Sequence, residues 1–155
     1  LDLCAGLAYL HDAGVVHCDV SPTNILIGPD RTQLTDFGVA SPVGQAQPTP
    51  RGTVAYMSPE QARGDTIDGR SDVFSVGVVA WELLTRRHLF MRAQPYLTLA
   101  AVVEDEVPSL DGAAPPALEA TIRRALAKDR EERWPSAAAL GAELAALARA
   151  DAGDR

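Results

Sequence analysis

Residues 72–84 are apolar almost throughout, and this segment constrains the fold more than any other part of the chain. Its length and its lack of proline favour a helix over a strand, although Gly77 and four valines weaken that preference. A helix that is apolar on all sides is a buried helix. The chain has 155 residues, of which 46% are hydrophobic, and that is enough for one domain with a substantial core around such a helix.

The remaining pattern predicts a mainly α fold with a short β-hairpin. Leucines at positions 3, 7 and 10 share one helix face, and the Ala- and Leu-rich second half favours further helices. A loop that is rich in proline and glycine covers residues 39–57, and loops of this length are usually functional or mobile. The expected helices cover residues 3–10, 72–84, 95–103, 116–126 and 136–148, and the expected strands cover residues 15–16, 25–27 and 34–35.

Charge and composition exclude several classes of function. The net charge is −7, which argues against a nucleic acid partner because phosphate neutralisation needs basic patches. No apolar run approaches the roughly 20 residues that a membrane span needs, and no signal peptide pattern is present. Two cysteines, Cys4 and Cys18, suggest reduced thiols rather than a disulfide framework. We therefore expect a cytoplasmic protein with no membrane segment in this chain.

Three oxygen-bearing side chains stand at short intervals on two predicted loops. Asp19 and Asn24 lie in the loop before the strand 25–27, and Asp36 follows the strand 34–35. A hairpin of these two strands would bring the three residues together. A carboxylate near a substrate hydroxyl can accept its proton, and Mg²⁺ prefers hard oxygen ligands while it bridges phosphates. The set therefore suits phosphoryl transfer, although Asx residues are also ordinary components of turns.

These motifs and several others resemble the eukaryotic-type protein kinase family, in its bacterial-like serine/threonine form. The family's catalytic loop is His-Arg-Asp with an Asn five residues after the Asp, and here it is His17, Cys18 and Asp19 with Asn24. The family's Asp-Phe-Gly stands unchanged at residues 36–38. The Gly-Thr-x-x-Tyr form of the later loop is similar to serine/threonine kinases rather than tyrosine kinases. Other segments resemble family motifs in the family's order: residues 52–57, 58–60, 71–77 and 129–135.

The resemblance implies a role for each matching residue in binding Mg²⁺ and ATP. Asp19 would be the catalytic base, and Asn24 and Asp36 would be the metal ligands. Ser21 and Leu26 would complete the nucleotide side, with Leu26 packed under the adenine ring. The resemblance also implies an activation segment that contains Thr49, Thr53 and Glu60, and it implies structural roles for His17, Phe37, Asp72 and Arg133.

Two residues depart from the family pattern. Cys18 replaces the Arg that often receives the activation-loop phosphate, so the usual receptor for a phosphate on Thr49 or Thr53 is missing. Ser21 stands where serine/threonine kinases usually carry Lys. A hydroxyl can bond to a phosphate oxygen but cannot neutralise it, which weakens the stabilisation of the transition state.

The resemblance covers only the C-terminal lobe of a kinase, over residues 1–149, with residues 150–155 as a tail. The N-terminal lobe, with its Gly-rich loop and phosphate-binding Lys, is expected to be absent, since Lys128 is the sole lysine and lies far downstream. We expect the partial domain to phosphorylate Ser/Thr hydroxyls of a protein only with that lobe supplied in cis or in trans, and the chain alone to be inactive. The alternatives are an inactive kinase-derived interaction module and, less well matched, a small-molecule phosphotransferase.

Overall fold

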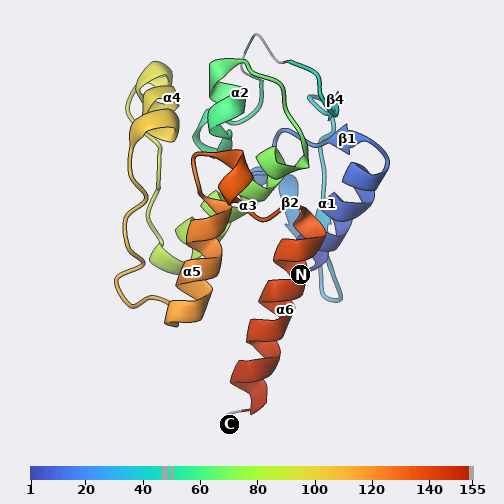
Figure 1. Ribbon diagram of the computed structural model, residues 1–155, viewed down its shortest axis with the longest axis vertical. Helices are drawn as coiled ribbons and strands as arrows, with labels where there is room; N and C mark the ends of the chain where they lie inside the picture. The colour runs from blue at the N-terminus through green and yellow to red at the C-terminus, as the bar shows by residue number, and fades with distance from the viewer. Residues whose placement is uncertain (47–48, 50, 154–155) are drawn as a thin grey trace.

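The computed structural model describes residues 1–46, 49 and 51–153, and helices dominate it (Figure 1). The order of its elements is α1 (Asp2–Asp12), β1 (Val15–Val16), the 3₁₀ helix η1 (Pro22–Asn24), β2 (Ile25–Ile27), β3 (Thr32–Leu34), β4 (Ser41–Pro42), η2 (Val54–Tyr56), α2 (Pro59–Arg63), α3 (Gly69–Thr85), α4 (Pro95–Glu104), α5 (Pro116–Ala125), η3 (Arg130–Glu132) and α6 (Ala137–Gly153).

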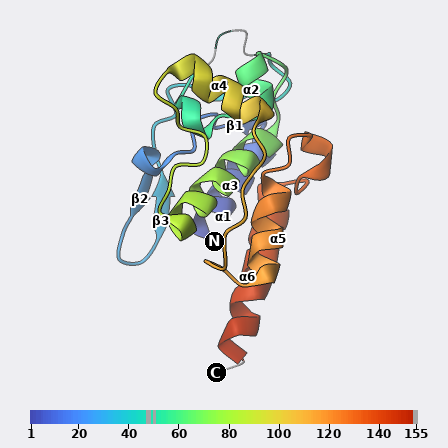
Figure 2. The ribbon, with the colours of Figure 1, turned by 90° about the vertical axis from the view of Figure 1, so that its left-hand side faces the viewer.

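Helix α3 forms the centre of the fold, as its apolar sequence predicts. It begins at Gly69, three residues earlier than expected, because the Asp68 carboxylate caps it by accepting a hydrogen bond from the Arg70 backbone N–H at 2.9 Å. Phe74 and Val78 on this helix have no exposed surface. Figure 2 shows α3 between the β2–β3 hairpin and α5. The site described below is therefore supported on a buried helix.

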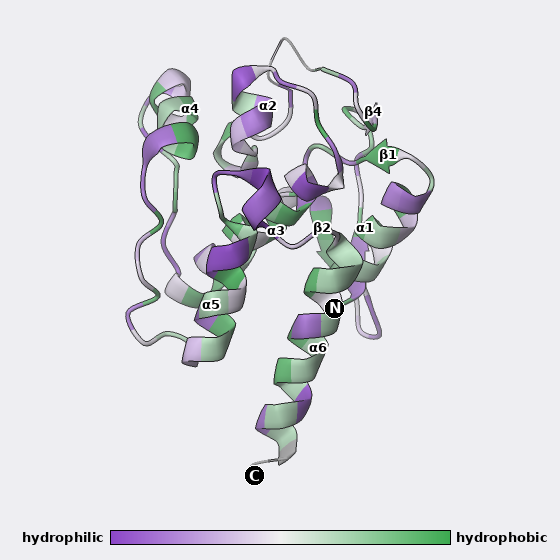
Figure 3. Ribbon diagram, in the orientation of Figure 1, coloured by the Kyte–Doolittle hydropathy of each residue, from purple (hydrophilic) through white to green (hydrophobic). Residues whose placement is uncertain are grey.

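Two groups of buried side chains pack on α3. One group joins α3 to η2, α4 and α5, and it contains Phe74 and Phe90, whose stacked ring centroids lie 6.0 Å apart. The other group joins α3 to α1, α5 and α6 through residues such as Leu7 and Leu140. Helices α5 and α6 carry both hydrophobic and hydrophilic residues along their length, as Figure 3 shows, in keeping with helices that have one buried side.

The strands differ in part from the expected ones. The hairpin is present, with Ile25 opposite Leu34 and Ile27 opposite Thr32, but β3 ends at Leu34 rather than at residue 35. The expected strand at residues 15–16 pairs with β4, inside the long loop that was expected to have no regular structure. This pairing joins the start of that loop to the chain before the site.

The final helix is longer than expected. It was predicted to end near Ala148 and it continues to Gly153, through a segment that contains an arginine and two alanines, which favour helix. Residues 150–153 of the expected tail are thus helical, and residues 154–155 lie outside the described part of the chain. Within that part, no helix is both long and apolar enough to cross a membrane.

Candidate active site

The side chains of Asp19 and Asn24 bond directly to each other. The Asn24 amide donates hydrogen bonds to the Asp19 backbone oxygen and to Asp19 Oδ2, both at 2.9 Å. The other carboxylate oxygen, Oδ1, accepts a hydrogen bond from the Thr53 backbone N–H at 2.7 Å. The five-residue spacing of Asp19 and Asn24 spans η1, whose turn brings the two side chains together. The Asp19 carboxylate is therefore held at both oxygens.

Glycine at position 52 allows the later loop to approach this carboxylate. Gly52 has φ +102°, a backbone conformation that residues with a Cβ rarely adopt. A Cβ on Gly52 would lie 3.0 Å from both Asp19 Oδ1 and the Cys18 carbonyl oxygen. The close contact between Thr53 and Asp19 thus depends on a glycine immediately before Thr53.

Asp36 is joined to the same loop through its neighbour Thr35. The backbone N–H and the hydroxyl of Thr35 both donate to the Asn24 carbonyl oxygen, at 2.9 and 3.2 Å. His17 Nε2 donates to the Thr35 carbonyl oxygen at 3.2 Å. Asp36 is exposed and has φ +62°, and its Oδ1 accepts a bond from the Gly38 N–H at 3.1 Å. These bonds connect Asp36 to Asn24 and His17 by way of one residue.

His17 acts here as a fully buried structural residue. Its Nδ1 accepts a hydrogen bond from the Asp19 N–H at 3.3 Å while its Nε2 donates to Thr35, so both ring nitrogens are engaged within the loops. The ring of Phe37 meets it edge-on with centroids 5.0 Å apart. Phe37 is 50% exposed and Leu26, on β2, is 53% exposed. Two large apolar side chains near the site are thus about half exposed to solvent.

The Asp72 carboxylate on α3 holds the backbone of the loop that carries Asp19. It is fully buried and accepts hydrogen bonds from the backbone N–H groups of His17 and Cys18, at 2.8 and 2.9 Å. A third donor, His11 Nε2, lies 2.8 Å from Asp72 Oδ2. The sequence did not identify His11 as part of this site. The His11 ring packs against Gly69, where a Cβ would lie 2.6 Å from His11 Nδ1. A glycine at this position is the one sequence feature that could have pointed to the contact.

Glu60, of the expected activation segment, and Arg133, for which a structural role was expected, form a buried ion pair. Two Arg133 nitrogens donate to the two carboxylate oxygens at 2.7 and 2.8 Å, and the Ser71 hydroxyl donates to Glu60 Oε1 at 2.7 Å. Arg133 is 1% exposed and also donates to three backbone carbonyl oxygens. Close by, a capping box at the start of α2 orients Gln61, whose side chain donates to the Cys18 carbonyl oxygen at 3.0 Å. Sequence reasoning missed Gln61.

The Glu60–Arg133 pair makes stability depend on pH. Burial by itself raises the pKa of the Glu60 carboxyl, but bonds to Arg133, its charge and the bond from Ser71 hold the pKa below its usual value. A carboxyl with a lower pKa in the folded state stabilises the protein above the unfolded pKa of about 4.3 and loses that contribution as pH falls through the folded value. We expect the free energy of unfolding, measured with denaturant from pH 6 to pH 3, to fall less steeply for Glu60→Gln than for the unaltered chain. Equal slopes would contradict the assignment.

Three other residues that the sequence singled out do not bring their side chains into this hydrogen-bonded centre. Ser21 is fully buried and its hydroxyl pairs with the Thr23 hydroxyl at 2.9 Å. Cys18 is 2% exposed, has φ +70° and belongs to a small apolar cluster with Val16 and Ile67. Thr49 is exposed. At the position where the family often carries an arginine, Cys18 thus packs against Val16 and Ile67.

Comparison with known proteins agrees with this geometry. The protein kinase domain family matches residues 1–143, and the chain belongs to that family. The chain is 37% identical over 158 residues to the serine/threonine-protein kinase PknB of Mycobacterium leprae and 41% identical over 152 residues to the serine/threonine-protein kinase PknL of Mycobacterium tuberculosis.

The match extends over much of this chain but over a minor part of these relatives. It covers 92% of the chain in both cases, and it covers 24% of PknB and 38% of PknL. Among solved structures, the PK-1 kinase of Cydia pomonella granulovirus superposes with a TM-score of 0.77 and 27% identity, over 89% of this chain and 53% of that one. The fold is therefore that of part of a protein kinase.

Proposed function

We propose that the chain forms the catalytic-loop half of a serine/threonine protein kinase, which transfers the γ-phosphate of ATP to a hydroxyl of a protein. The observation that carries the proposal is the Asp19 carboxylate, which is bonded to Asn24 on one side and to Thr53 on the other. In this reading Asp19 contacts the reacting hydroxyl, and Thr53 belongs to the segment that receives the substrate.

The oxygen atoms around Asp19 suit a magnesium ion that carries ATP phosphates. The Asn24 amide nitrogen donates both of its hydrogen bonds to Asp19. Asn24 is only 8% exposed, and its Oδ1 has no hydrogen bond to any described residue. Asp36 Oδ1 bonds to Gly38, and Oδ2 has no partner in the described part of the chain. Neutral and anionic oxygens of this kind fit Mg²⁺. When bound, Mg²⁺ would neutralise charge on the phosphates, with Asn24 and Asp36 as its protein ligands.

Asp19 is placed to take the proton of an acceptor hydroxyl. Each carboxylate oxygen accepts one hydrogen bond from the protein and retains a second lone pair. The bonds from Asn24 and Thr53 restrict the rotation of the carboxylate, so the base is oriented before a substrate arrives. Such preorganisation lowers the cost of positioning during the reaction.

The segment after Gly52 supports a protein substrate rather than a small molecule. The turn of η2 is held to α3 at two points: the Ser75 hydroxyl donates to the Tyr56 carbonyl oxygen at 2.7 Å, and the Tyr56 hydroxyl donates to Glu82 Oε2 at 2.7 Å. Small-molecule phosphotransferases are not expected to carry this Gly-Thr-x-x-Tyr segment. A rigid turn beside the base suits an extended peptide that presents Ser or Thr.

The nucleotide would need a second lobe, in cis or in trans. Leu26 supplies an exposed apolar surface for the adenine ring, and Ser21 would contribute through its backbone, since its hydroxyl is bonded to Thr23. We infer that the Gly-rich loop and the phosphate-binding lysine come from that lobe, and that the assembled kinase acts in the cytoplasm.

Replacing Asp19 is the direct test of this function. We expect the chain alone to transfer no measurable phosphate from ATP to a generic Ser/Thr protein acceptor. A chimaera with the upper lobe of PknL placed before residue 1 is expected to be active, and Asp19→Asn is expected to lower its kcat at least about a hundredfold because the general base is lost. Incorporation of labelled γ-phosphate measures both.

The matched control is Asp12→Asn, which removes an exposed carboxylate at the end of α1. This variant is expected to keep the rate of the chimaera. A folded chimaera without activity would favour the alternative of a kinase-derived interaction module. Activity that survives Asp19→Asn would exclude Asp19 as the base.

A further inference from the structure

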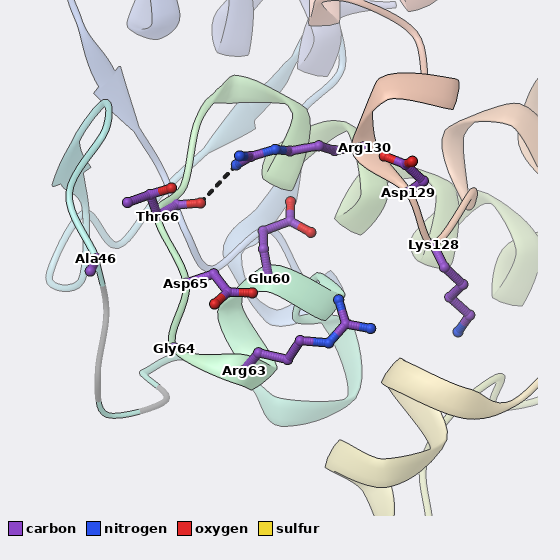
Figure 4. Close-up of a pocket in the computed structure, with 9 residues that line it drawn as sticks. All are labelled: Ala46, Glu60, Arg63, Gly64, Asp65, Thr66, Lys128, Asp129 and Arg130. Carbon is purple, nitrogen blue, oxygen red and sulfur yellow. Dashed lines mark hydrogen bonds between the residues drawn. The ribbon is translucent and has the colours of Figure 1, made fainter.

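A cavity of about 700 Å³ lies outside the candidate active site, between the end of α2 and the loop that precedes η3 (Figure 4). Three cationic side chains line it, from Arg63, Lys128 and Arg130. Arg130 donates to the Thr66 carbonyl oxygen at 2.8 Å, whereas the Arg63 side chain has no hydrogen bond or ion pair with any described residue. None of the residues assigned to catalysis lines the cavity.

Three acidic side chains, from Glu60, Asp65 and Asp129, also line the cavity and equal the basic ones in number. Glu60 is already paired with Arg133, and Asp129 Oδ1 accepts a hydrogen bond from the Glu131 backbone N–H. Asp65 is exposed at the surface. Because the Arg63 guanidinium has no partner among the described residues, it remains available to a small anion, and Figure 4 shows it extending into the same space as Lys128.

Lys128 is the only lysine in the chain, and its amine has an unusual environment. Nζ lies 4.3 Å from the centroid of the buried Phe90 ring and 5.8 Å from that of Phe74, and it donates to the Val102 carbonyl oxygen at the end of α4. The side chain also lines a second cavity of about 310 Å³, on the side of Asp105 and Glu106. The Lys128 side chain is therefore partly buried and lines both cavities.

Burial favours the uncharged amine, whereas the Phe90 ring and the Val102 carbonyl oxygen favour the charged form. Burial lowers the pKa of Lys128 to about 8; the charge of Asp105 opposes this shift, and the charges of Arg133 and Arg63 add to it. About a quarter of such amines are uncharged at pH 7.5, against roughly one in a thousand for a lysine with the ordinary pKa of about 10.4. A desolvated lysine beside other cations is the usual form of a nucleophilic lysine.

We propose that Lys128 is a modification site that accepts acyl groups from small acyl phosphates bound in the cavity beside Arg63. The Nζ lone pair attacks the carbonyl carbon, and a C–N bond forms. The bond from carbon to the phosphate oxygen breaks, inorganic phosphate leaves with its electron pair, and the amine proton passes to solvent. The Arg63 guanidinium suits the leaving phosphate, since arginine binds phosphate oxygens bidentately.

Acylation would change the contacts of α4. The product is a neutral amide, so the cation over the Phe90 ring is lost and only one N–H remains in place of three. The bond to Val102 is the link between Lys128 and α4, and the longer acylated side chain cannot keep the same place over Phe90. The modification thus acts on a helix that packs against η2, next to the proposed substrate segment.

The test compares two lysines in one molecule. Arg149→Lys places a second lysine on the exposed end of α6, where the arginine has no ion pair with any described residue. The chain is incubated with acetyl phosphate at pH 7.5, and peptide mass spectrometry follows acetylation at positions 128 and 149 separately from the α-amino group. We expect position 128 to react at least about tenfold faster, because its larger uncharged fraction outweighs the lower nucleophilicity of a weaker base.

Two further measurements separate this site from a merely accessible amine. The rate at position 128 should level off above about pH 8, whereas the rate at position 149 should keep rising to pH 10. Arg63→Gln should slow acetylation by acetyl phosphate at position 128, but should leave its reaction with neutral acetic anhydride within about twofold. Equal or slower reaction at position 128 than at position 149 would overturn the proposal, and an unchanged rate in Arg63→Gln would remove the phosphate site.

Discussion

Truncation of Arg133 to alanine is expected to lower the free energy of unfolding by about 3–5 kcal/mol, among the largest effects available in this chain. The side chain is 1% exposed and bonds to both oxygens of Glu60. Its loss leaves the buried Glu60 carboxylate without its cation. It also removes the donors to the backbone carbonyl oxygens of Arg70, Ala127 and Lys128. Denaturant unfolding followed by circular dichroism measures the change.

The control for this prediction is an arginine in an exposed ion pair. Arg123 donates to Glu119 at 3.1 Å, four residues earlier on α5, and pairs of this kind contribute little. Arg123→Ala is therefore expected to cost at most about 1 kcal/mol. If both variants lose the same stability, the buried pair does not hold α2 in place.

Replacement of Asp72 by alanine is expected to free the backbone of the catalytic loop. The carboxylate satisfies buried N–H groups of His17 and Cys18 and pairs with His11. A buried donor without a partner costs about 1–3 kcal/mol, so the loss of these bonds is expected to total roughly 4 kcal/mol. Hydrogen exchange of the two amides reports the effect directly, and denaturant unfolding gives its size.

Two milder variants separate the contributions of Asp72 and His11 to holding the loop. Asp72→Asn keeps one acceptor oxygen and is expected to cost less than Asp72→Ala. His11→Ala leaves the bonds of the carboxylate to His17 and Cys18 in place and is expected to preserve the protection of those amides. Protected amides in Asp72→Ala would show that another group holds the loop.

The helices of this fold could be predicted because their signal is local. The apolar run on α3 and the leucine spacing on α1 identify buried faces from sequence alone, and both helices are present. The contact of Asp19 with Asn24 could be predicted for the same reason, since the two residues are only five positions apart in the chain. The pairing of β1 with β4 could not be predicted, because two-residue strands carry no periodic pattern.

The supports of the candidate site could not be predicted, because they join polar residues far apart in the chain. His11 and Asp72 are separated by 61 residues, and Gln61 and Cys18 by 43. Neither pair has a spacing motif, and the residue types give little guidance, since glutamine is mostly exposed and histidine is intermediate in burial. Only the packing of α1 and α2 around α3 makes these bonds possible.

Helix α3 also has a consequence for how the site responds to disturbance. Polar side chains along this one helix reach separate parts of the site: Ser71 the carboxylate of Glu60, Asp72 the catalytic loop, and Ser75 and Glu82 the two ends of Tyr56. The loop that carries Asp19 and the turn of η2 are thus both positioned by one helix. A displacement of α3 is expected to move both together, so the spacing between Asp19 and η2 is expected to change little.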